Sequence, residues 1–359
     1  MSRIYNFSAG PAILPEETIK EAQEKLFDYQ GCGMSILEVS HRGKEYAAVH
    51  EELKDNLKKV ANISDDYSLL FLGGGATTQF AMVPMNLRGE GQSADYVHTG
   101  AWAGKAIKEA KVLGATKVVA DTSKEQPACI PDASSIKASD GAAYLHITSN
   151  ETIGGTQWRS YPKVDAPLVA DMSSDIFCRP VDINSFGLIY AGAQKNLGPA
   201  GVTLVIVRKD LAERVSDKIP NIFRYKSHIA QDSLLNTPPC FSCYMLMLTT
   251  RWIMKEGGLA AIGKRNEEKA AKLYAAIDST EFYRGTASLE SRSIMNVTFR
   301  LPSEELEAKF IKDAGSQNMK GLKGHRDVGG IRASIYNAFP AAGVDALIAF
   351  MKEFEKANG

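Results

Sequence analysis

The sequence predicts an α/β protein whose mostly parallel β-sheet is covered by helices. Between about residues 67 and 208, short apolar runs alternate with segments of helical spacing, an alternation that is typical of a parallel sheet. The runs that end at Ala170, Gln194 and Val207 are continuous, as expected for strands that are buried on both faces. No internal repeat and no low-complexity linker divides the chain.

Length and composition are those of an ordinary globular protein. The chain has 359 residues, 44% hydrophobic and 23% charged, which suffices for a large core and predicts two domains or one with an appendage. Lys+Arg and Asp+Glu are each 42, so no overall charge recruits nucleic acid or an anionic membrane. No apolar run reaches the roughly 18 residues of a membrane span, and no signal-peptide pattern is present. We therefore expect a cytoplasmic protein.

The five cysteines predict neither a disulfide framework nor a zinc site. They are scattered and odd in number, and the C-x-x-C motif at Cys240 and Cys243 lacks the second pair that such a zinc site requires. Reduced thiols in a cytosolic protein are the expected state. No metal is predicted.

The N-terminal region contains two predicted helices. Residues 3–15 form an irregular segment, and the acidic residues after Pro15 begin a helix, since Pro and acidic side chains both favour a first turn. A basic loop that contains His41 and Arg42 precedes a second helix over residues 45–60. A solvated loop pair is the alternative to a functional role for these two side chains.

Strands and helices then alternate along the chain. Runs rich in β-branched residues predict strands, and apolar residues at intervals of three and four predict helices. The predicted strands are 67–72, 94–99, 117–120, 142–148 and 202–207. One helix is expected to begin at residues 79–82, and another is expected over residues 103–113.

A glycine-rich turn follows the strand at 67–72. Three glycines precede Ala76, Thr77 and Thr78, and the next helix is expected to begin at Gln79. Backbone N–H groups at such a junction point outward and the helix dipole favours negative charge, so the turn suits a monophosphate. It lacks the nucleotide P-loop pattern. A turn that only links a strand to a helix is the alternative.

An acid and an amine end two of the buried runs. Residues 168–170 lead to Asp171, and residues 188–194 lead to Lys195. At the ends of neighbouring strands both side chains would lie at the sheet edge where α/β proteins bind ligands. The pair suits pyridoxal 5'-phosphate (PLP), whose aldehyde forms a Schiff base with lysine and whose ring nitrogen needs a carboxylate. A surface lysine and a helix-capping aspartate are the alternative.

Two further strand ends carry side chains suited to an aromatic ring. Trp102 lies between small residues after the strand at 94–99, so its indole can stack flat on a ring, with core filler as the alternative. The polar residues Ser149 to Thr152 follow the strand at 142–148 and can hydrogen-bond a ring substituent.

The C-terminal third predicts a smaller α+β unit. A stiff turn at Asn236–Pro239 precedes a helix over 244–255. The elements predicted after it are helices over 259–277 and 304–314, strands at 295–299 and 330–336, and a final amphipathic helix that carries Val344, Leu347 and Met351. We expect a large cofactor-binding domain over residues 16–265 and a small domain made of residues 1–15 and 266–359.

Eight segments together resemble the phosphoserine aminotransferase family. In chain order they are NFSAGPAILP, EVSHRGKE, GGGATTQF, NETIGG, ADMSSD, YAGAQKNLGPAG, NTPP and GHRDVGGIRASIYNA. The resemblance extends from about residue 4 to residue 358 with no missing block. It implies a fold-type-I, PLP-dependent homodimer with a seven-stranded sheet in a large domain and a smaller α+β domain.

The resemblance also implies the residues that hold the cofactor. Lys195 resembles the Schiff-base lysine that shuttles the substrate proton, and Asp171 resembles the partner of the ring nitrogen. Many relatives carry Gly-Arg or Gly-Cys at positions 76 and 77, which leaves the contribution of these side chains open. The other implied positions are Trp102, stacked on the ring; Thr152, at the ring edge; Ala76, Thr77 and Gln194, at the phosphate; and Asn236 and Thr237, which reach the phosphate from the neighbouring subunit.

Substrate-binding residues follow from the same resemblance. Arg332 resembles the clamp on the α-carboxylate, a bidentate pairing that suits a guanidinium. His41, Arg42, His325 and Arg326 resemble the group that binds the distal anion, with a solvated neighbour as the alternative for Arg326. The implied reaction converts 3-phosphohydroxypyruvate and L-glutamate to O-phospho-L-serine and 2-oxoglutarate in serine biosynthesis. Some relatives also transaminate phosphohydroxythreonine in pyridoxine biosynthesis, which the sequence leaves open.

Two other classes of function compete with this interpretation. Desulfuration on the same cofactor would need a mobile cysteine near Lys195, and none of the five cysteines lies in a Gly/Ser-rich loop. A non-catalytic binding protein of the same fold would not need both Asp171 and Lys195. Sulfide release from cysteine and glutamate-induced bleaching of bound PLP discriminate these classes.

Overall fold

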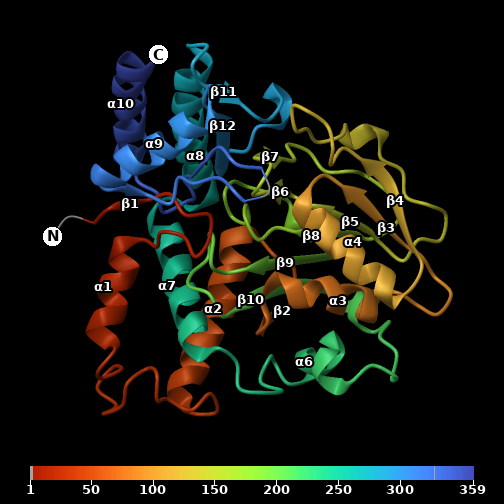
Figure 1. The fold of residues 1–359 in the computed structure, drawn as a ribbon. Helices are drawn as coiled ribbons and strands as arrows, with labels where there is room; N and C mark the ends of the chain where they lie inside the picture. Colours follow the sequence, from red (N-terminus) through yellow and green to blue (C-terminus); the bar gives the residue numbers. More distant parts are fainter. Residues whose placement is uncertain (1–2, 327) are drawn as a thin grey trace.

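The computed structural model describes residues 3–326 and 328–359, and within them the central sheet has seven strands (Figure 1). Strand β10 is antiparallel to both of its neighbours, and the other pairs are parallel. The predicted mostly parallel sheet is therefore confirmed. The strand order is β2 (Tyr67–Leu72), β10 (Thr203–Arg208), β9 (Leu188–Gly192), β8 (Leu168–Asp171), β5 (Leu145–Thr148), β3 (Ala94–His98) and β4 (Thr116–Asp121).

Helices cover both faces of this sheet. Because side chains alternate along a strand, Leu204 and Ile206 belong to one hydrophobic cluster while Val205 and Val207 belong to another. All four are fully buried, and each contributes about 1.5–3 kcal/mol relative to an exposed side chain. The first cluster includes α2 (Lys44–Ala61) and α7 (Cys240–Lys255), and the second includes α3 (Gly75–Leu87) and α4 (Ala101–Leu113).

The C-terminal region has a hydrophobic cluster of its own, which lies at the upper left of Figure 1. Phe7 and Ile13 from the N-terminal segment belong to it. A short parallel pairing of β1 (Tyr5–Asn6) with β13 (Met319–Lys320) fastens this segment in place. The other elements around the cluster are the antiparallel strands β11 (Arg284–Gly285), β12 (Asn296–Arg300) and β14 (Ile331–Ser334), with helices α8 (Gly258–Asp278), α9 (Glu304–Ser316) and α10 (Ala341–Asn358).

The structure differs from the sequence-based expectation at several helix starts. Helix α3 begins at Gly75 instead of near Gln79, because Gly74 adopts φ 89° and already ends the turn. Helix α4 begins at Ala101, so Trp102 lies in its first turn. The remaining α-helices and strands are α1 (Glu16–Lys25), α5 (Lys209–Ala212), α6 (Tyr225–Ala230) and the hairpin of β6 (Asn150–Glu151) with β7 (Thr156–Gln157), and four single-turn 3-10 helices lie in the loops of the described chain.

The cysteines are unpaired, and the C-x-x-C pair lies in the first turn of α7. Cys243 is buried and Cys240 is half-buried. Over residues 3–326 and 328–359, no helix combines the length and the apolar character that a bilayer crossing requires.

Candidate active site

Strands β8 and β9 bring Asp171 and Lys195 to the same edge of the sheet. The two strands are adjacent and parallel, with Asp171 opposite Tyr190. Asp171 is the last residue of β8, and Lys195 follows the end of β9. The charge of each residue shifts the pKa of the other, which indicates one shared site.

The amine of Lys195 lies among site residues from other elements. Its Nζ donates a hydrogen bond of 2.7 Å to the Thr152 hydroxyl and lies 5.3 Å from the centroid of the Trp102 ring. Burial lowers the pKa of Lys195 to about 8, although the charges of Asp171 and Glu151 act in the opposite direction. The lowered pKa increases the fraction of neutral amine near physiological pH, and the neutral amine is the form that attacks a carbonyl.

The carboxylate of Asp171 is buried at the end of its strand. Burial raises its pKa, while hydrogen bonding by Ser173 and the charge of Lys195 lower it. The Ser173 N–H donates to Asp171 Oδ1 at 2.9 Å. A buried carboxylate of this kind is stabilised by a cation, and a protonated ring nitrogen supplies one.

Trp102 and Glu151 meet at the start of α4. The Trp102 N–H lies 3.2 Å from Glu151 Oε2, and the Ala103 N–H lies 3.0 Å from Oε1. The indole of Trp102 is half-buried, and among the described residues its Nε1 has no hydrogen-bond partner. Thr152 follows Glu151 directly, so one short segment contacts both Trp102 and Lys195.

The glycine-rich turn forms the start of α3. Gly74 and Gly75 both have positive φ, 89° and 69°, and a Cβ on Gly74 would lie 2.1 Å from the Thr78 hydroxyl oxygen. Ala76 and Thr77 consequently occupy the first helical turn, whose N–H groups have no partner within the helix. The Thr78 hydroxyl donates to the Gly74 carbonyl oxygen at 2.9 Å, so its proton is used within the helix.

Arg332 lines a cavity of about 680 Å³. Its Nη1 lies 3.4 Å from the Thr152 carbonyl, and within the described part of the chain its buried Nε has no hydrogen-bond partner. Burial lowers the pKa of Arg332, so the cation is partly stripped of water. His325 and Ile153 line the same cavity, whereas Arg326 is exposed.

The remaining sequence-predicted residues lie elsewhere on the chain. His41 and Thr237 line a separate hollow together with Leu37, and Arg42 Nε lies 3.3 Å from His41 Nε2. Asn236 is exposed and contacts the Thr237 carbonyl at 3.2 Å. Figure 1 shows the loop before α2 at the lower left and β6 in the upper middle of the molecule. Within residues 3–326 and 328–359, none of these four residues hydrogen-bonds to Lys195 or lines the cavity beside Arg332.

The residues at this edge fit PLP. A buried carboxylate, a partly neutral amine and an indole face surround one position, as the ring nitrogen, aldehyde and ring plane require. The first turn of α3 offers backbone N–H groups to a phosphate. Gln194, next to Lys195, is tied to the N-terminal segment by the 2.8 Å hydrogen bond from the Ala12 N–H to its carbonyl.

Comparison with known proteins identifies the class to which this site belongs. The family model of class-V aminotransferases matches residues 4–347. The protein is thus an enzyme, a PLP-dependent aminotransferase.

Relatives narrow the assignment. The chain is 53% identical over 357 residues to a phosphoserine aminotransferase of Geobacillus kaustophilus, covering 99% of each chain. A solved phosphoserine aminotransferase from Bacillus circulans subsp. alkalophilus superimposes with a TM-score of 0.97 at 51% identity, covering 99% of both chains. A PLP-bound phosphoserine aminotransferase from Trichomonas vaginalis gives a TM-score of 0.90 at 38% identity, covering 98% of this chain and 100% of that one. The chain belongs to the phosphoserine aminotransferase family.

The structure adds residues that sequence analysis did not assign. Asp175 accepts hydrogen bonds from the Ser149 hydroxyl and from Gln157 Nε2, the latter at 3.0 Å, and burial raises its pKa to about 6. Asn150 Nδ2 donates to Asn296 Oδ1 at 2.8 Å and so connects β6 to β12. The polar run 149–152 was the only sequence signal for these contacts. It did not identify the partners, because they lie far away in the sequence.

Proposed function

We propose that the chain transfers the amino group of L-glutamate to 3-phosphohydroxypyruvate, giving 2-oxoglutarate and O-phospho-L-serine, as a step of serine biosynthesis. The observation that carries this proposal is the Arg332 cation, held beside Thr152 and Lys195 and exposed to a cavity. Both substrates carry an α-carboxylate and a second anionic group. His325 in the same cavity provides a second basic side chain for that distal anion.

Each site residue has a proposed task in this reaction. PLP supplies an aldehyde carbon and a ring that accepts electrons. Lys195 Nζ removes the α-proton of the amino acid, and its lowered pKa keeps part of the amine ready to accept it. The Arg332 guanidinium orients the α-carboxylate, and Asp171 stabilises positive charge at the ring nitrogen.

The substrate preference tests the proposal. A charge-assisted hydrogen bond is worth about 1.5–3 kcal/mol, so one lost contact to the distal phosphate corresponds to about 10- to 100-fold in kcat/KM. With glutamate as donor, 3-phosphohydroxypyruvate should therefore exceed pyruvate, which has no distal anion, by at least this factor, and should also exceed oxaloacetate, whose distal group is a carboxylate. Equal use of all three acceptors would contradict the proposed substrate.

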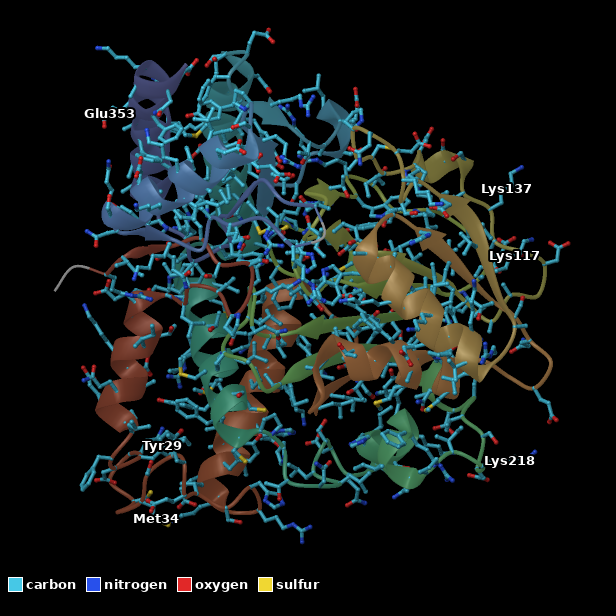
Figure 2. All side chains as sticks on the ribbon, in the orientation of Figure 1. Tyr29, Met34, Lys117, Lys137, Lys218 and Glu353 are labelled. Atoms are coloured by element: carbon cyan, nitrogen blue, oxygen red, sulfur yellow. The ribbon has the colours of Figure 1, made fainter. Side chains whose placement is uncertain are left out.

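We also propose a homodimer in which each site uses residues of both chains. The loop between α1 and α2 exposes large apolar side chains: Phe27 is 92% exposed and Leu37 is 61% exposed. Met34 of this loop is 41% exposed and lies at the lower left edge of the molecule in Figure 2. An exposed apolar surface beside His41, Arg42 and Thr237 suits a second copy of the chain.

Mixing Lys195→Ala with Arg42→Ala tests the shared site, if activity is measured at a phosphoserine concentration far below the raised KM of the Arg42 variant. Lys195→Ala removes the amine and Arg42→Ala removes the partner's cation, so a mixed dimer retains one complete site. Random exchange of equal amounts should restore about a quarter of wild-type activity. Activity that stays at the level of the separate variants would contradict shared sites.

The division into domains and the cellular location are proposals of the same kind. The separate cluster that joins Phe7 and Ile13 to the C-terminal elements supports a small domain of residues 1–15 and 266–359 beside a large domain of 16–265. Five unpaired cysteines are compatible with a reducing, cytoplasmic location. Limited proteolysis between the domains and fractionation of cells test these two points.

A further inference from the structure

Helix α4 begins without a capping side chain of its own. Its N-cap residue is Gly100, which makes no side-chain hydrogen bond. The N–H groups of Trp102 and Ala103, which a capping Ser or Asp would serve, instead contact the two carboxylate oxygens of Glu151 at 3.2 and 3.0 Å. A residue from the β6 strand therefore caps α4 from a distant part of the sequence.

Gly100 is matched to this arrangement. A Cβ at this position would lie 2.8 Å from Glu151 Cδ and 3.0 Å from its Oε2. Its φ of 162° is extended backbone that other residues adopt, so conformation does not require glycine here. The space that a local capping side chain would fill is occupied by the Glu151 carboxylate.

Burying this carboxylate is unfavourable as a means of capping alone. Glu151 is fully buried, and burial raises its pKa to about 7 although the two backbone N–H groups lower it. A Ser or Asp at the half-buried position 100 would satisfy the same amides with less desolvation. The buried arrangement adds a connection, because Glu151 contacts Trp102 while the adjacent Thr152 contacts Lys195.

We propose that Glu151 is a positioning residue that fixes the Trp102 indole relative to Lys195 by capping helix α4. The inference rests on the proposed stacking of Trp102 on the cofactor ring and extends it to a residue with no assigned task. Rigid placement of both partners lets PLP bind without ordering the start of α4 first, which favours tight binding.

Amide hydrogen exchange tests the capping step directly. The full chain, with and without added PLP, is compared with Glu151→Gln, which keeps the size and removes the charge. Gly100→Ala is a second variant that displaces the carboxylate and leaves Glu151 itself unchanged. In both variants, exchange over residues 101–104 should become about 10- to 100-fold faster. Unchanged exchange in both would overturn the proposal.

Ser303→Ala is the matched control, because Ser303 caps α9 through the Leu306 N–H at 3.2 Å, in the C-terminal region. It should accelerate exchange at the start of α9 and leave residues 101–104 unchanged.

The dissociation constant of PLP tests the positioning step. Glu151→Gln and Gly100→Ala should raise it about tenfold, with the KM for glutamate within twofold of wild type, whereas Ser303→Ala should leave both unchanged. Faster exchange without weaker PLP binding would show a purely structural cap and overturn the inference. Failure of the proposed function is distinguishable, since it would appear as absent turnover in the wild type.

Discussion

Replacing Lys195 with Met should stabilise the cofactor-free protein, because the fold holds this ammonium where burial disfavours it. The pKa of Lys195 falls from the ordinary 10.5 to about 8 in the folded chain. At pH 7 the shift corresponds to a penalty of about 3 kcal/mol for the protonated amine. Lys195 is half-buried, so water reduces this penalty, and we expect a gain of about 2 kcal/mol.

The direction of the pKa shift determines how the stability difference between the two proteins changes with pH. Because the folded-state pKa lies below the unfolded value, the unfolded chain binds more protons between pH 8 and 10.5. Wild-type stability should therefore rise through this window, and the advantage of the Met variant should shrink by about 1–2 kcal/mol between pH 7 and pH 9.5.

Urea unfolding of the two proteins at both pH values measures the difference. A Met variant no more stable than wild type at pH 7, or an advantage independent of pH, would refute the argument that burial makes this amine reactive.

Three further predictions follow from the same contacts. Asp171→Asn should lower turnover at least about 100-fold while Lys195 still binds PLP, because the amide cannot stabilise a protonated ring nitrogen; steady-state kinetics check this, and wild-type turnover would contradict it. Arg42→Ala should raise the KM for phosphoserine more than that for a short neutral amino acid, and an equal effect on both would remove Arg42 from anion binding. Lys269→Met should destabilise the protein by about 3 kcal/mol or more in the urea assay, since Nζ donates to three buried carbonyls at 2.8–3.0 Å. An unchanged unfolding midpoint would contradict the last prediction.

Lys195 and Lys269 show that the direction of a pKa shift alone does not decide whether replacing the lysine stabilises or destabilises the protein. Burial lowers the pKa of Lys269 to about 7, which resembles the shift at Lys195. Lys269, however, satisfies the carbonyls of the segment that follows β14, so its removal leaves acceptors unpaired. Lys195 has one hydrogen bond to a hydroxyl in the described structure, and its loss leaves little unsatisfied.

The continuous apolar runs made the central sheet predictable. Strand β2 covers the expected residues 67–72, and β8 and β9 place Asp171 and Lys195 together as their strand ends indicated. The predicted start of α3 was wrong by one turn. The left-handed conformation of Gly74, which ends the glycine-rich turn, has no distinctive signal in the sequence.

Contacts between segments that are distant in the chain could not be predicted from the sequence. The pairing of β1 with β13 involves two residues on each strand, too few for a periodic pattern. The link from Glu151 to the start of α4 connects two elements whose local sequences are each unremarkable. Whether His41 and Arg42 lie near Lys195 depends on assembly, which a single chain's pattern does not encode.

The identity of the lysine that holds PLP tests the account most directly. Borohydride reduction of the PLP-loaded protein fixes the cofactor to that lysine, and peptide mass spectrometry then locates it. We predict one modified peptide that carries the pyridoxyl group on Lys195, with no modification in Lys195→Ala. Attachment at another lysine, or an unchanged yield in the variant, would contradict the central claim.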